Sequence, residues 1–143
     1  MALSDAEIRD ALVTKCLILE PFDEKNLNPA GYDLRVGNEV ILGPGEQRLV
    51  ATKERVKLGS DLVGMLHLRS SLAREGIIAS LALVDPGFRG QLTISLFNAG
   101  RKTASLRTNE RFVQLTLVRL GRPAVSKYEG RYQDSNGIVG SRR

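Results

Sequence analysis

The sequence predicts an all-β domain, a distorted jelly roll or β-barrel, with one short N-terminal helix. Its 143 residues fit a single domain, so separate cofactor and substrate lobes are not expected. Short apolar runs recur between Gly and Pro residues along most of the chain, and only one segment near the N-terminus has helical spacing. Hydrophobic residues make up 42% and charged residues 26%, which is typical of globular proteins and excludes disordered or collagen-like chains.

The expected helix begins after Ser4. Ser4 and Glu7 have the spacing of a capping box, in which each side chain accepts a hydrogen bond from the other residue's backbone. Ile8, Ala11 and Leu12 follow at helical spacing and would face the core. The sequence therefore predicts one short amphipathic helix that packs on the β domain.

Strands are expected beyond Pro21, because short apolar runs alternate there with turns such as Gly43-Pro44-Gly45. The predicted strands are Asp33–Val36, Glu39–Leu42, Arg48–Ala51, Val63–Leu68, Ile77–Leu83, Leu92–Phe97 and Phe112–Leu120. In the last of these, apolar residues alternate with Gln114 and Thr116, which is the period of a half-buried strand. Many short strands without a second convincing helix favour a barrel or jelly roll over an α/β fold.

The chain divides into a β domain, residues 1–125, and a C-terminal tail, residues 126–143. The tail holds four basic residues and two tyrosines but almost no aliphatic run, so it cannot bury enough apolar surface to form part of the core. We expect the tail to become ordered on a partner. Residues 101–143 contain ten Lys and Arg against three acidic residues, a net charge of +7, which suits a polyanion such as a nucleic acid or a nucleotide's phosphates.

Several function classes are excluded or disfavoured by composition. Cys16 is the single cysteine and His67 the single histidine, so an internal disulfide, a zinc site and a triad that uses several histidines are not expected. No apolar run reaches the roughly 18 residues of a membrane span, and the acidic N-terminus does not resemble a signal peptide, so we expect a cytoplasmic protein. With three Tyr, four Phe and no Trp, a base-stacking nucleic-acid surface is disfavoured.

Two carboxylates stand beside Pro and Gly turns at the ends of predicted strands. Asp33 follows the turn Asn28–Tyr32 and begins a strand, where a structural role is the ordinary one. Asp85 ends an apolar run just before Pro86-Gly87-Phe88. A partly desolvated carboxylate at that position can act as a general base on water, or it can close an Asx-turn, and the spacing alone does not decide between these roles.

A third segment has the chemistry of a phosphate site. Arg69-Ser70-Ser71-Leu72-Ala73-Arg74 ends an apolar strand with two guanidinium groups and two hydroxyls. Arginine makes bidentate, charge-assisted hydrogen bonds to phosphate, and serine hydroxyls supply further donors. The alternative is that Ser70 or Ser71 caps a helix, which is a purely structural role.

Taken in order, these segments resemble a known family, the trimeric dUTPases and dCTP deaminases, and most closely the archaeal dUTPases of the deaminase branch. The matching segments are Leu3-Ser4-Asp5-x-x-Ile8, Pro29–Gly37, Arg69–Arg74, Asp85–Gly90, Phe97–Gly100, and Tyr128, Tyr132-Gln133 and Ser141-Arg142 in the tail. The resemblance implies a jelly-roll-like homotrimer with active sites at the subunit junctions and a Mg²⁺-bound deoxynucleoside triphosphate as substrate.

The resemblance also implies roles for individual residues. Asp85 would be the base that activates water, Asp33 would support Mg²⁺ through water, and Phe88 would lie against the deoxyribose. The residues expected to bind phosphate, or to close over it from the tail, are Arg69, Ser70, Ser71, Arg74, Gln114, Tyr128, Arg131 and Gln133. The base would be recognised by the hairpin between Arg74 and Asp85, for which we assign Ala79, Ser80 and Leu81.

One departure from the family's pattern separates its two activities. Deaminases of this family carry a catalytic glutamate in the strand after the Asp-Pro-Gly turn, where this chain has Ser95. A serine cannot shuttle protons at neutral pH as a carboxylate can. The sequence therefore predicts hydrolysis of dUTP to dUMP and pyrophosphate, which would limit uracil in DNA and supply dUMP for dTMP synthesis. The alternatives are a dCTP deaminase, a bifunctional deaminase and dUTPase, or a non-catalytic nucleotide-binding regulator; a DNA-binding module would not explain the three ordered motifs.

Overall fold

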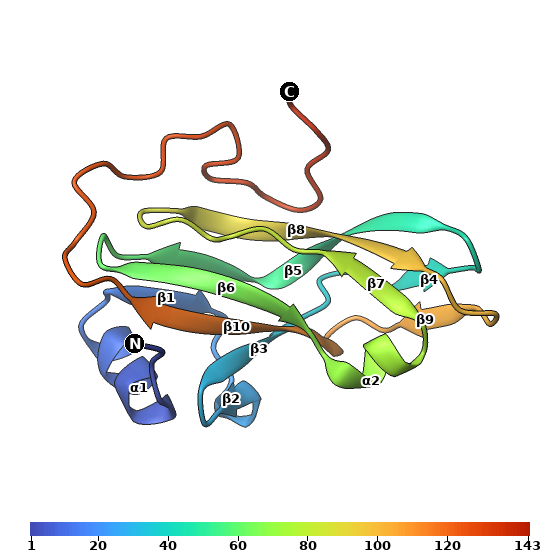
Figure 1. The fold of residues 1–143 in the computed structure, drawn as a ribbon, viewed down its shortest axis with the longest axis horizontal. Coiled ribbons are helices and arrows are strands. Elements are labelled where there is room, and N and C mark those ends of the chain that lie inside the picture. Colours follow the sequence, from blue (N-terminus) through green and yellow to red (C-terminus); the bar gives the residue numbers. More distant parts are fainter.

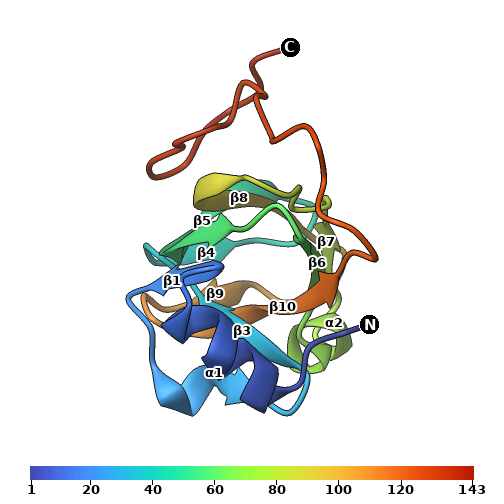
Figure 2. The same ribbon diagram turned by 90° about the vertical axis from the view of Figure 1, so that its left-hand side faces the viewer.

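Two four-stranded antiparallel sheets packed face to face form the body of the protein (Figures 1 and 2). The computed structural model describes residues 1–143. In order across the first sheet lie β1 (Leu17–Glu20), β5 (Gln47–Leu58), β8 (Arg89–Asn98) and β7 (Ile77–Ser80). Across the second lie β2 (Leu27–Asn28), β3 (Gly31–Arg35), β10 (Arg111–Arg119) and β6 (Leu62–Leu68), and a separate pair joins β4 (Val40–Leu42) to β9 (Ala104–Leu106). The predicted all-β class is confirmed, and the sheets do not close into a barrel.

The predicted N-terminal helix is present as α1 (Asp5–Val13) with Ser4 as its N-cap. The capping box is complete: the Ser4 hydroxyl accepts a hydrogen bond from the Glu7 backbone N–H at 3.3 Å, and the Glu7 carboxylate accepts one from the Ser4 backbone N–H at 2.9 Å. Hydrogen bonds that the Ser4 backbone N–H and the Ser4 hydroxyl donate to the Glu7 carboxylate lower the pKa of Glu7. Ile8 and Ala11 are buried as their spacing predicts. No helix in the structure has the length and apolar character needed to span a membrane.

The core lies between the two sheets and contains 26 buried apolar residues, with Tyr32 and Phe112 the largest of them. The alternation predicted for the last strand is confirmed in β10, where Val113, Leu115 and Leu117 are buried. The structure also has short elements that the sequence pattern did not indicate, namely β1, β2, β9 and the 3₁₀ helix η1 (Glu24–Asn26), and the helix α2 (Ser70–Arg74), which was only an alternative for the serine and arginine segment. Each has five residues or fewer, which is too few for a periodic pattern to emerge.

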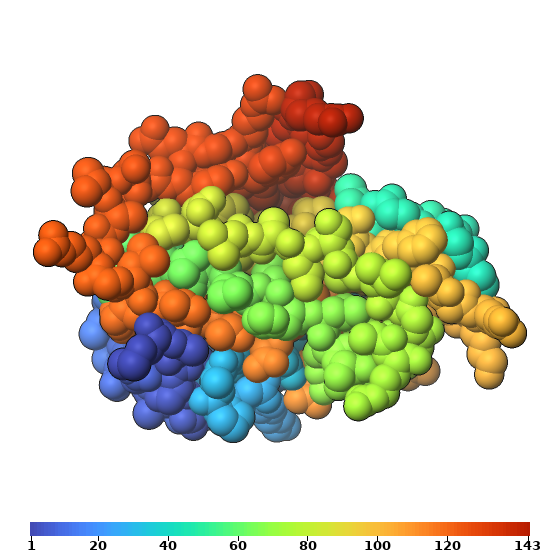
Figure 3. All heavy atoms as spheres, in the orientation of Figure 1, coloured from blue at the N-terminus to red at the C-terminus, as the bar shows by residue number.

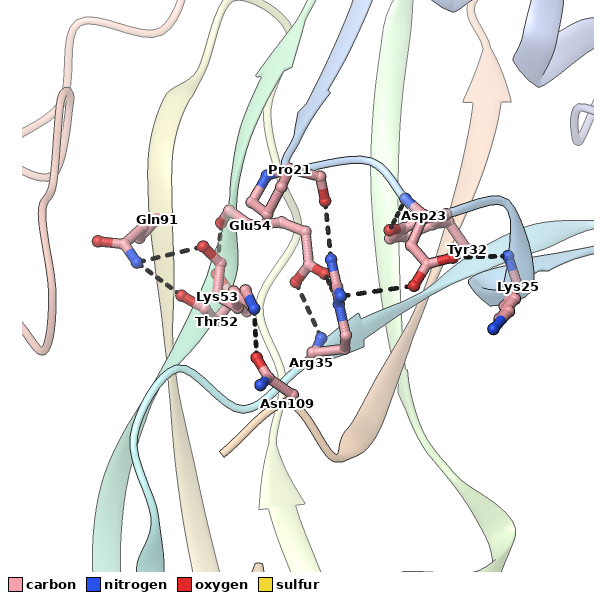
Figure 4. Close-up of polar contacts among 10 residues, drawn as sticks. All are labelled: Pro21, Asp23, Lys25, Tyr32, Arg35, Thr52, Lys53, Glu54, Gln91 and Asn109. Atoms are coloured by element: carbon pink, nitrogen blue, oxygen red, sulfur yellow. Dashed lines mark hydrogen bonds and ion pairs between the residues drawn. The ribbon is translucent and has the colours of Figure 1, made fainter. Parts of the chain in front are cut away.

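A bulge in β5 joins the two sheets through a buried ion pair. Ala51 pairs with Thr93 and Arg55 with Gln91, so residues 52–54 face the single residue between those partners. The fully buried Glu54 carboxylate of this bulge accepts hydrogen bonds from the Arg35 Nε at 2.6 Å and from the Arg35 backbone N–H at 2.9 Å (Figure 4). Burial tends to lower the pKa of Arg35, but the hydrogen bond and charge of Glu54 outweigh it and raise that pKa.

Removing the charge of Glu54 should destabilise the whole fold. Glu54→Gln keeps the shape of the side chain but leaves the largely buried Arg35 guanidinium with only the more exposed Asp23 carboxylate, at 3.7 Å, as a counter-charge. Loss of one partner of a buried pair costs about 3–5 kcal/mol. Urea unfolding should show a clearly lower midpoint for this variant. Glu39→Gln, at an exposed position without an ion pair, is the matched control and should unfold like the parent. Equal midpoints for all three proteins would contradict the prediction.

Candidate functional site

Asp85 lies at a pocket of about 370 Å³, a volume within the range of small-molecule sites. The preceding Val84 is held to Gly64 of β6 by two backbone hydrogen bonds of 2.9 Å, and the turn closes when the Phe88 N–H donates to the Asp85 carbonyl at 3.1 Å. The Asp85 carboxylate itself is exposed and makes no hydrogen bond or ion pair with the protein. The turn therefore uses the backbone of Asp85 and leaves its carboxylate free, which removes the Asx-turn alternative.

The pocket walls combine apolar side chains with hydroxyl groups. The lining residues are Leu49, Ser80, Ala82, Leu83, Val84, Asp85, Phe88, Gln91, Leu92, Thr93, Ser95, Tyr128, Tyr132, Ser135, Val139, Gly140 and Ser141. Ser95 lies on β8, and its hydroxyl accepts a hydrogen bond from Gln47 Nε2 of β5 at 2.8 Å. Asp85 is the single carboxylate among the lining residues. The pocket thus places the Asp85 carboxylate, which can accept a proton, beside a largely apolar wall against which the ring of a ligand could pack.

The C-terminal tail forms the outer wall of this pocket. In Figure 2 the tail rises beyond β8, on the side of the sandwich opposite α1, and in Figure 3 its orange and red atoms rest on the yellow-green residues that lead into β8. Tyr128 packs edge-on against Phe88, with 5.5 Å between ring centroids. The sequence predicted that the tail needs a partner to become ordered. In the structure, β8 and the Asp85–Phe88 turn of the same chain form hydrogen bonds with the tail and provide part of that partner.

Two tail side chains that were predicted to bind phosphate have protein partners here. The Gln133 amide donates to the Gly87 carbonyl and accepts from the Arg89 backbone N–H, both at 2.9 Å. Arg131 and Arg142 each donate a side-chain hydrogen bond to the other's carbonyl. These contacts stabilise the fold of the tail, and the phosphate role of the two residues stays a prediction.

A second group of predicted site residues gathers around Asp33. Gln114 of β10 lies opposite Asp33 of β3, and both line a polar depression of about 450 Å³ with Asn28, Leu68, Arg69 and Ser70. The Asp33 carboxylate is only 5% exposed and lies 3.5 Å from Arg69 Nε and 3.6 Å from Arg111 Nη1. We term Asp33, Arg69, Ser70, Arg111 and Gln114 the cationic cluster.

Ser70 begins the five-residue helix α2, but it does not cap that helix. Arg69 occupies the N-cap position and makes no side-chain capping hydrogen bond, so neither serine has the structural role considered for it. The Ser70 hydroxyl accepts a hydrogen bond from Arg74 Nη1 at 3.2 Å, and Ser71 is exposed on the same helix. Arg69, Ser70, Ser71 and Arg74, four of the residues predicted to bind phosphate, therefore lie together at one end of β6.

The Asp85 pocket and the cationic cluster are separated within one chain. Val84 pairs with Gly64 in the antiparallel sense, so Asp85 lies further from the Ser70 end of β6. With about 3.3 Å per strand residue, the separation is on the order of 20 Å. Ser80 reaches the Asp85 pocket, whereas Ala79 and Leu81 pack against the core. The two groups of predicted site residues therefore lie apart in one chain, and we term them the two half-sites of the candidate site.

Sequence reasoning missed Arg111, although this residue faces Asp33. Arg111 pairs with Arg35 while Val113 pairs with Leu34, so one extra residue stands in β10 between them. This bulge directs the Arg111 side chain to Asp33, against the simple alternation of the strand. The position of a bulge depends on pairing with a distant strand, and no local signal in the sequence marked it.

A family model described as dCTP deaminase-like matches residues 2–42 and 37–120. The chain belongs to this family. Among its relatives, a protein named dCTP deaminase from Pyrococcus abyssi is 46% identical over 158 aligned positions, which cover 100% of this chain and 99% of that protein. A protein of Sulfolobus islandicus rod-shaped virus 1 named probable deoxyuridine 5′-triphosphate nucleotidohydrolase is 35% identical over 154 positions, with 97% of each chain covered. Relatives that carry the names of both activities thus align along nearly the whole length.

Solved structures of both kinds share the fold. The dCTP deaminase of Agrobacterium tumefaciens superposes with a TM-score of 0.71 at 20% identity over 84% of this chain, and this chain spans about half (48%) of that one. A dUTPase of phage phi11 of S. aureus, which coordinates a structural Mg(II) ion, superposes with a TM-score of 0.61 at 19% identity over 81% of this chain and 98% of that one. These structural similarities confirm the predicted fold. They do not distinguish deamination from hydrolysis, so the two reactions must be distinguished from the residues of the site.

Proposed function

We propose that this protein is a dUTP diphosphatase, which hydrolyses dUTP to dUMP and pyrophosphate. The observation that carries the proposal is the composition of the pocket: Asp85 is its single carboxylate, and Ser95 lines it as well. By the resemblance described above, Ser95 stands where deaminases would carry a catalytic glutamate. Hydrolysis of a phosphoanhydride needs one base and a set of cationic groups. Deamination needs a group that moves protons to and from the pyrimidine ring, and a serine hydroxyl is a poor choice for this task at neutral pH.

The free carboxylate of Asp85 suits the role of general base. It would accept a proton from a water molecule as the water oxygen forms a bond to the α-phosphorus and the bond from that phosphorus to the bridging oxygen breaks. Pyrophosphate then leaves with the bridging oxygen, and dUMP retains the oxygen from water. Arg69, Arg74 and Ser70 would bind the phosphate oxygens on which negative charge develops.

The residues present fit a magnesium ion that travels with the triphosphate. No group of three or more potential metal ligands exists in the chain, and the Asp33 carboxylate is already paired with Arg69 and Arg111. Magnesium keeps several waters and takes only one or two protein carboxylates in nucleotide sites, so Asp33 would contact it through water. When bound, Mg²⁺ would neutralise phosphate charge and orient the triphosphate.

The separation of the two half-sites supports a homotrimer with active sites between subunits. The cationic cluster of one chain and the Asp85 pocket of another would together hold the phosphates and the nucleoside. The excess of positive charge in residues 101–143 then serves the triphosphate of a small-molecule substrate, without a nucleic-acid or membrane partner.

Deamination of dCTP is the second candidate, because relatives at 42–46% identity carry the name dCTP deaminase. A bifunctional enzyme would release both ammonia and pyrophosphate from dCTP. The position that separates these activities is Ser95.

The products formed from dUTP and dCTP in the presence of Mg²⁺ test the proposal directly. We expect dUMP and pyrophosphate from dUTP, and no ammonia from dCTP. Chromatography of the nucleotides and an ammonia assay give the two readouts. Ammonia release from dCTP at a rate comparable with dUTP hydrolysis would establish the deaminase or bifunctional alternative.

Asp85→Asn should lower kcat by about 10²-fold or more, because the amide keeps the size of the side chain but cannot accept the proton. KM for dUTP should change little. Arg74→Ala should instead raise KM as well, because it removes a contact to substrate charge. Asp10→Asn, on the exposed face of α1, is the matched control. Hydrolysis by Asp85→Asn near the parent rate would reduce Asp85 to a turn residue.

Sedimentation at micromolar concentration should give a species of three times the 15.7 kDa chain mass. The physical reason is that neither half-site alone can position both the base and the phosphates. A monomer with full activity would be incompatible with shared active sites.

A further inference from the structure

Ser95 lies on the outer face of the first sheet, at one end of the Asp85 pocket. Its neighbours along β8 are buried in the core, so its own side chain points outward. On that face it stands opposite Leu49 of β5 and Ser80 of β7, and all three residues line the pocket. Ser95 follows Gly90 by five residues along β8, which corresponds to roughly 16 Å in an extended strand. It therefore marks the end of the pocket that is remote from the Asp85 turn.

Most polar side chains of the pocket already have partners in the protein. β7 pairs with only the last four residues of β8, and the tail lies along the remaining edge. There Gln91 Oε1 accepts a hydrogen bond from the Gly137 N–H at 2.6 Å, while its Nε2 donates to the Thr52 carbonyl of the β5 bulge at 2.8 Å (Figure 4). Thr93 Oγ1 accepts from the Val139 N–H at 3.0 Å. The other hydroxyl groups that bond to the backbone of the tail are those of Tyr128, Tyr132, Ser135 and Ser141.

Two hydroxyls and one carboxylate of the pocket remain free to contact a ligand, those of Ser80, Ser95 and Asp85. Neither serine hydroxyl donates a hydrogen bond within the chain. Ser95 differs from Ser80 because an amide from the neighbouring strand reaches it: Gln47 Nε2 of β5 donates to Ser95 Oγ at 2.8 Å. Gln47 pairs with Phe97, two residues after Ser95, so its amide approaches the hydroxyl diagonally across the sheet. The far end of the pocket is therefore a hydroxyl that a neighbouring amide holds in place.

The hydrogen bond from Gln47 sets the polarity that Ser95 presents to a ligand. A serine hydroxyl has one proton to donate and two lone pairs that can accept. Because the Gln47 amide occupies one lone pair, the hydroxyl proton is the group that still needs a partner. A carbonyl oxygen of a ligand satisfies this proton, whereas an amino group in the same place leaves it unpaired. An unpaired polar group beside an apolar wall costs free energy, so the pocket favours a carbonyl at this end.

This polarity distinguishes the two pyrimidines, which differ at one edge of the ring. Uracil carries a carbonyl at position 4 and an N–H at position 3, where cytosine carries an amino group and an unprotonated nitrogen. Position 4 lies across the ring from the nitrogen that bears the sugar, so it points away from the phosphates. In the proposed reaction Asp85 acts at the α-phosphate, and the far edge of the ring is then directed to the end of the pocket where Ser95 lies.

We propose that Ser95 and Gln47 select uracil over cytosine at the binding step, with the Ser95 hydroxyl as donor to the carbonyl at position 4 and Gln47 as the positioning residue that sets its polarity. The inference rests on the proposed function for the direction in which the nucleotide lies. It adds a determinant that acts in binding, whereas the missing proton shuttle at Ser95 acts in the chemical step. Affinity for unreacted nucleotides and formation of products are separate measurements, so failure of this role and failure of the proposed function are distinguishable.

Gln47→Glu tests the polarity, because a carboxylate accepts hydrogen bonds and cannot donate one. The Ser95 proton then bonds to the new carboxylate, and Ser95 Oγ presents only lone pairs to a ligand. Isothermal titration calorimetry with Mg²⁺ and the α,β-imido analogues of dUTP and dCTP, in which a nitrogen replaces the bridging oxygen and resists hydrolysis, gives both affinities. The parent should bind the uracil analogue about 10-fold more tightly, the effect of one neutral hydrogen bond. In Gln47→Glu the order of the two affinities should reverse.

Two further variants complete the test. Ser95→Ala removes the donor, so the two analogues should bind with nearly equal affinity. Asn38→Asp adds the same negative charge as Gln47→Glu at an exposed position that does not line the pocket, and it should keep the parent ratio. The ratio compares two ligands on one protein, so a general loss of affinity or stability cannot imitate a reversal.

The parent ratio in Gln47→Glu, or parent selectivity in Ser95→Ala, would overturn the role of this pair even if dUTP is hydrolysed as proposed. Chromatography of the recovered ligands separates the other failure: deamination of the cytosine analogue would overturn the proposed function, and this role of Ser95 with it. Reversal in Gln47→Glu with intact ligands supports the proposal independently of any turnover.

Discussion

The buried pair of Glu54 and Arg35 determines how the two sheets meet, and both half-sites depend on it. Arg35 ends β3 two residues after Asp33, while Glu54 belongs to the bulge of β5 in the opposite sheet. The same bulge contains Thr52, whose hydroxyl donates to the Glu54 carbonyl at 2.9 Å and accepts from the Leu92 N–H at 3.0 Å. A buried charge is tolerated only with a partner, so this pair fixes the bulge in one arrangement. The bulge then orients Gln91, and Gln91 binds the tail.

The two carboxylates of the candidate site, Asp33 and Asp85, differ in whether positively charged side chains lie beside them, and this difference suggests different roles. Asp33 is buried and lies between Arg69 and Arg111, so its charge is used to hold two guanidinium groups side by side. Without that carboxylate the two cations would repel each other and lose their common orientation. Asp85 has no such partner and lies at the mouth of a largely apolar pocket. A carboxylate that the protein leaves free is available for proton transfer, whereas a paired one is suited to positioning.

Sequence reasoning succeeded where a role is set by neighbours along the chain. The capping box of Ser4 and Glu7, the alternation of β10 and the turn at Asp85 are all local, and each is present as expected. It failed where pairing between distant segments decides the geometry. The bulge that directs Arg111 to Asp33 depends on the register of β10 with β3. The order of the tail depends on the uncovered edge of β8, more than 40 residues away, whereas composition alone suggested a segment that needs a partner to become ordered.

The Asp85–Gly90 motif combines two tasks in six residues. Its first residue carries the free carboxylate, and its glycines, with Arg89 and the following Gln91, form the surface on which the tail lies. Because the Gln133 amide bonds to both the Gly87 carbonyl and the Arg89 N–H, the docked tail restrains the turn that positions Asp85. The conformation of the carboxylate and the closure of the pocket are therefore coupled through one short segment of backbone. In the proposed hydrolysis, such coupling would let a docked tail limit the access of bulk water to the pocket and hold the Asp85 carboxylate in place at the same time.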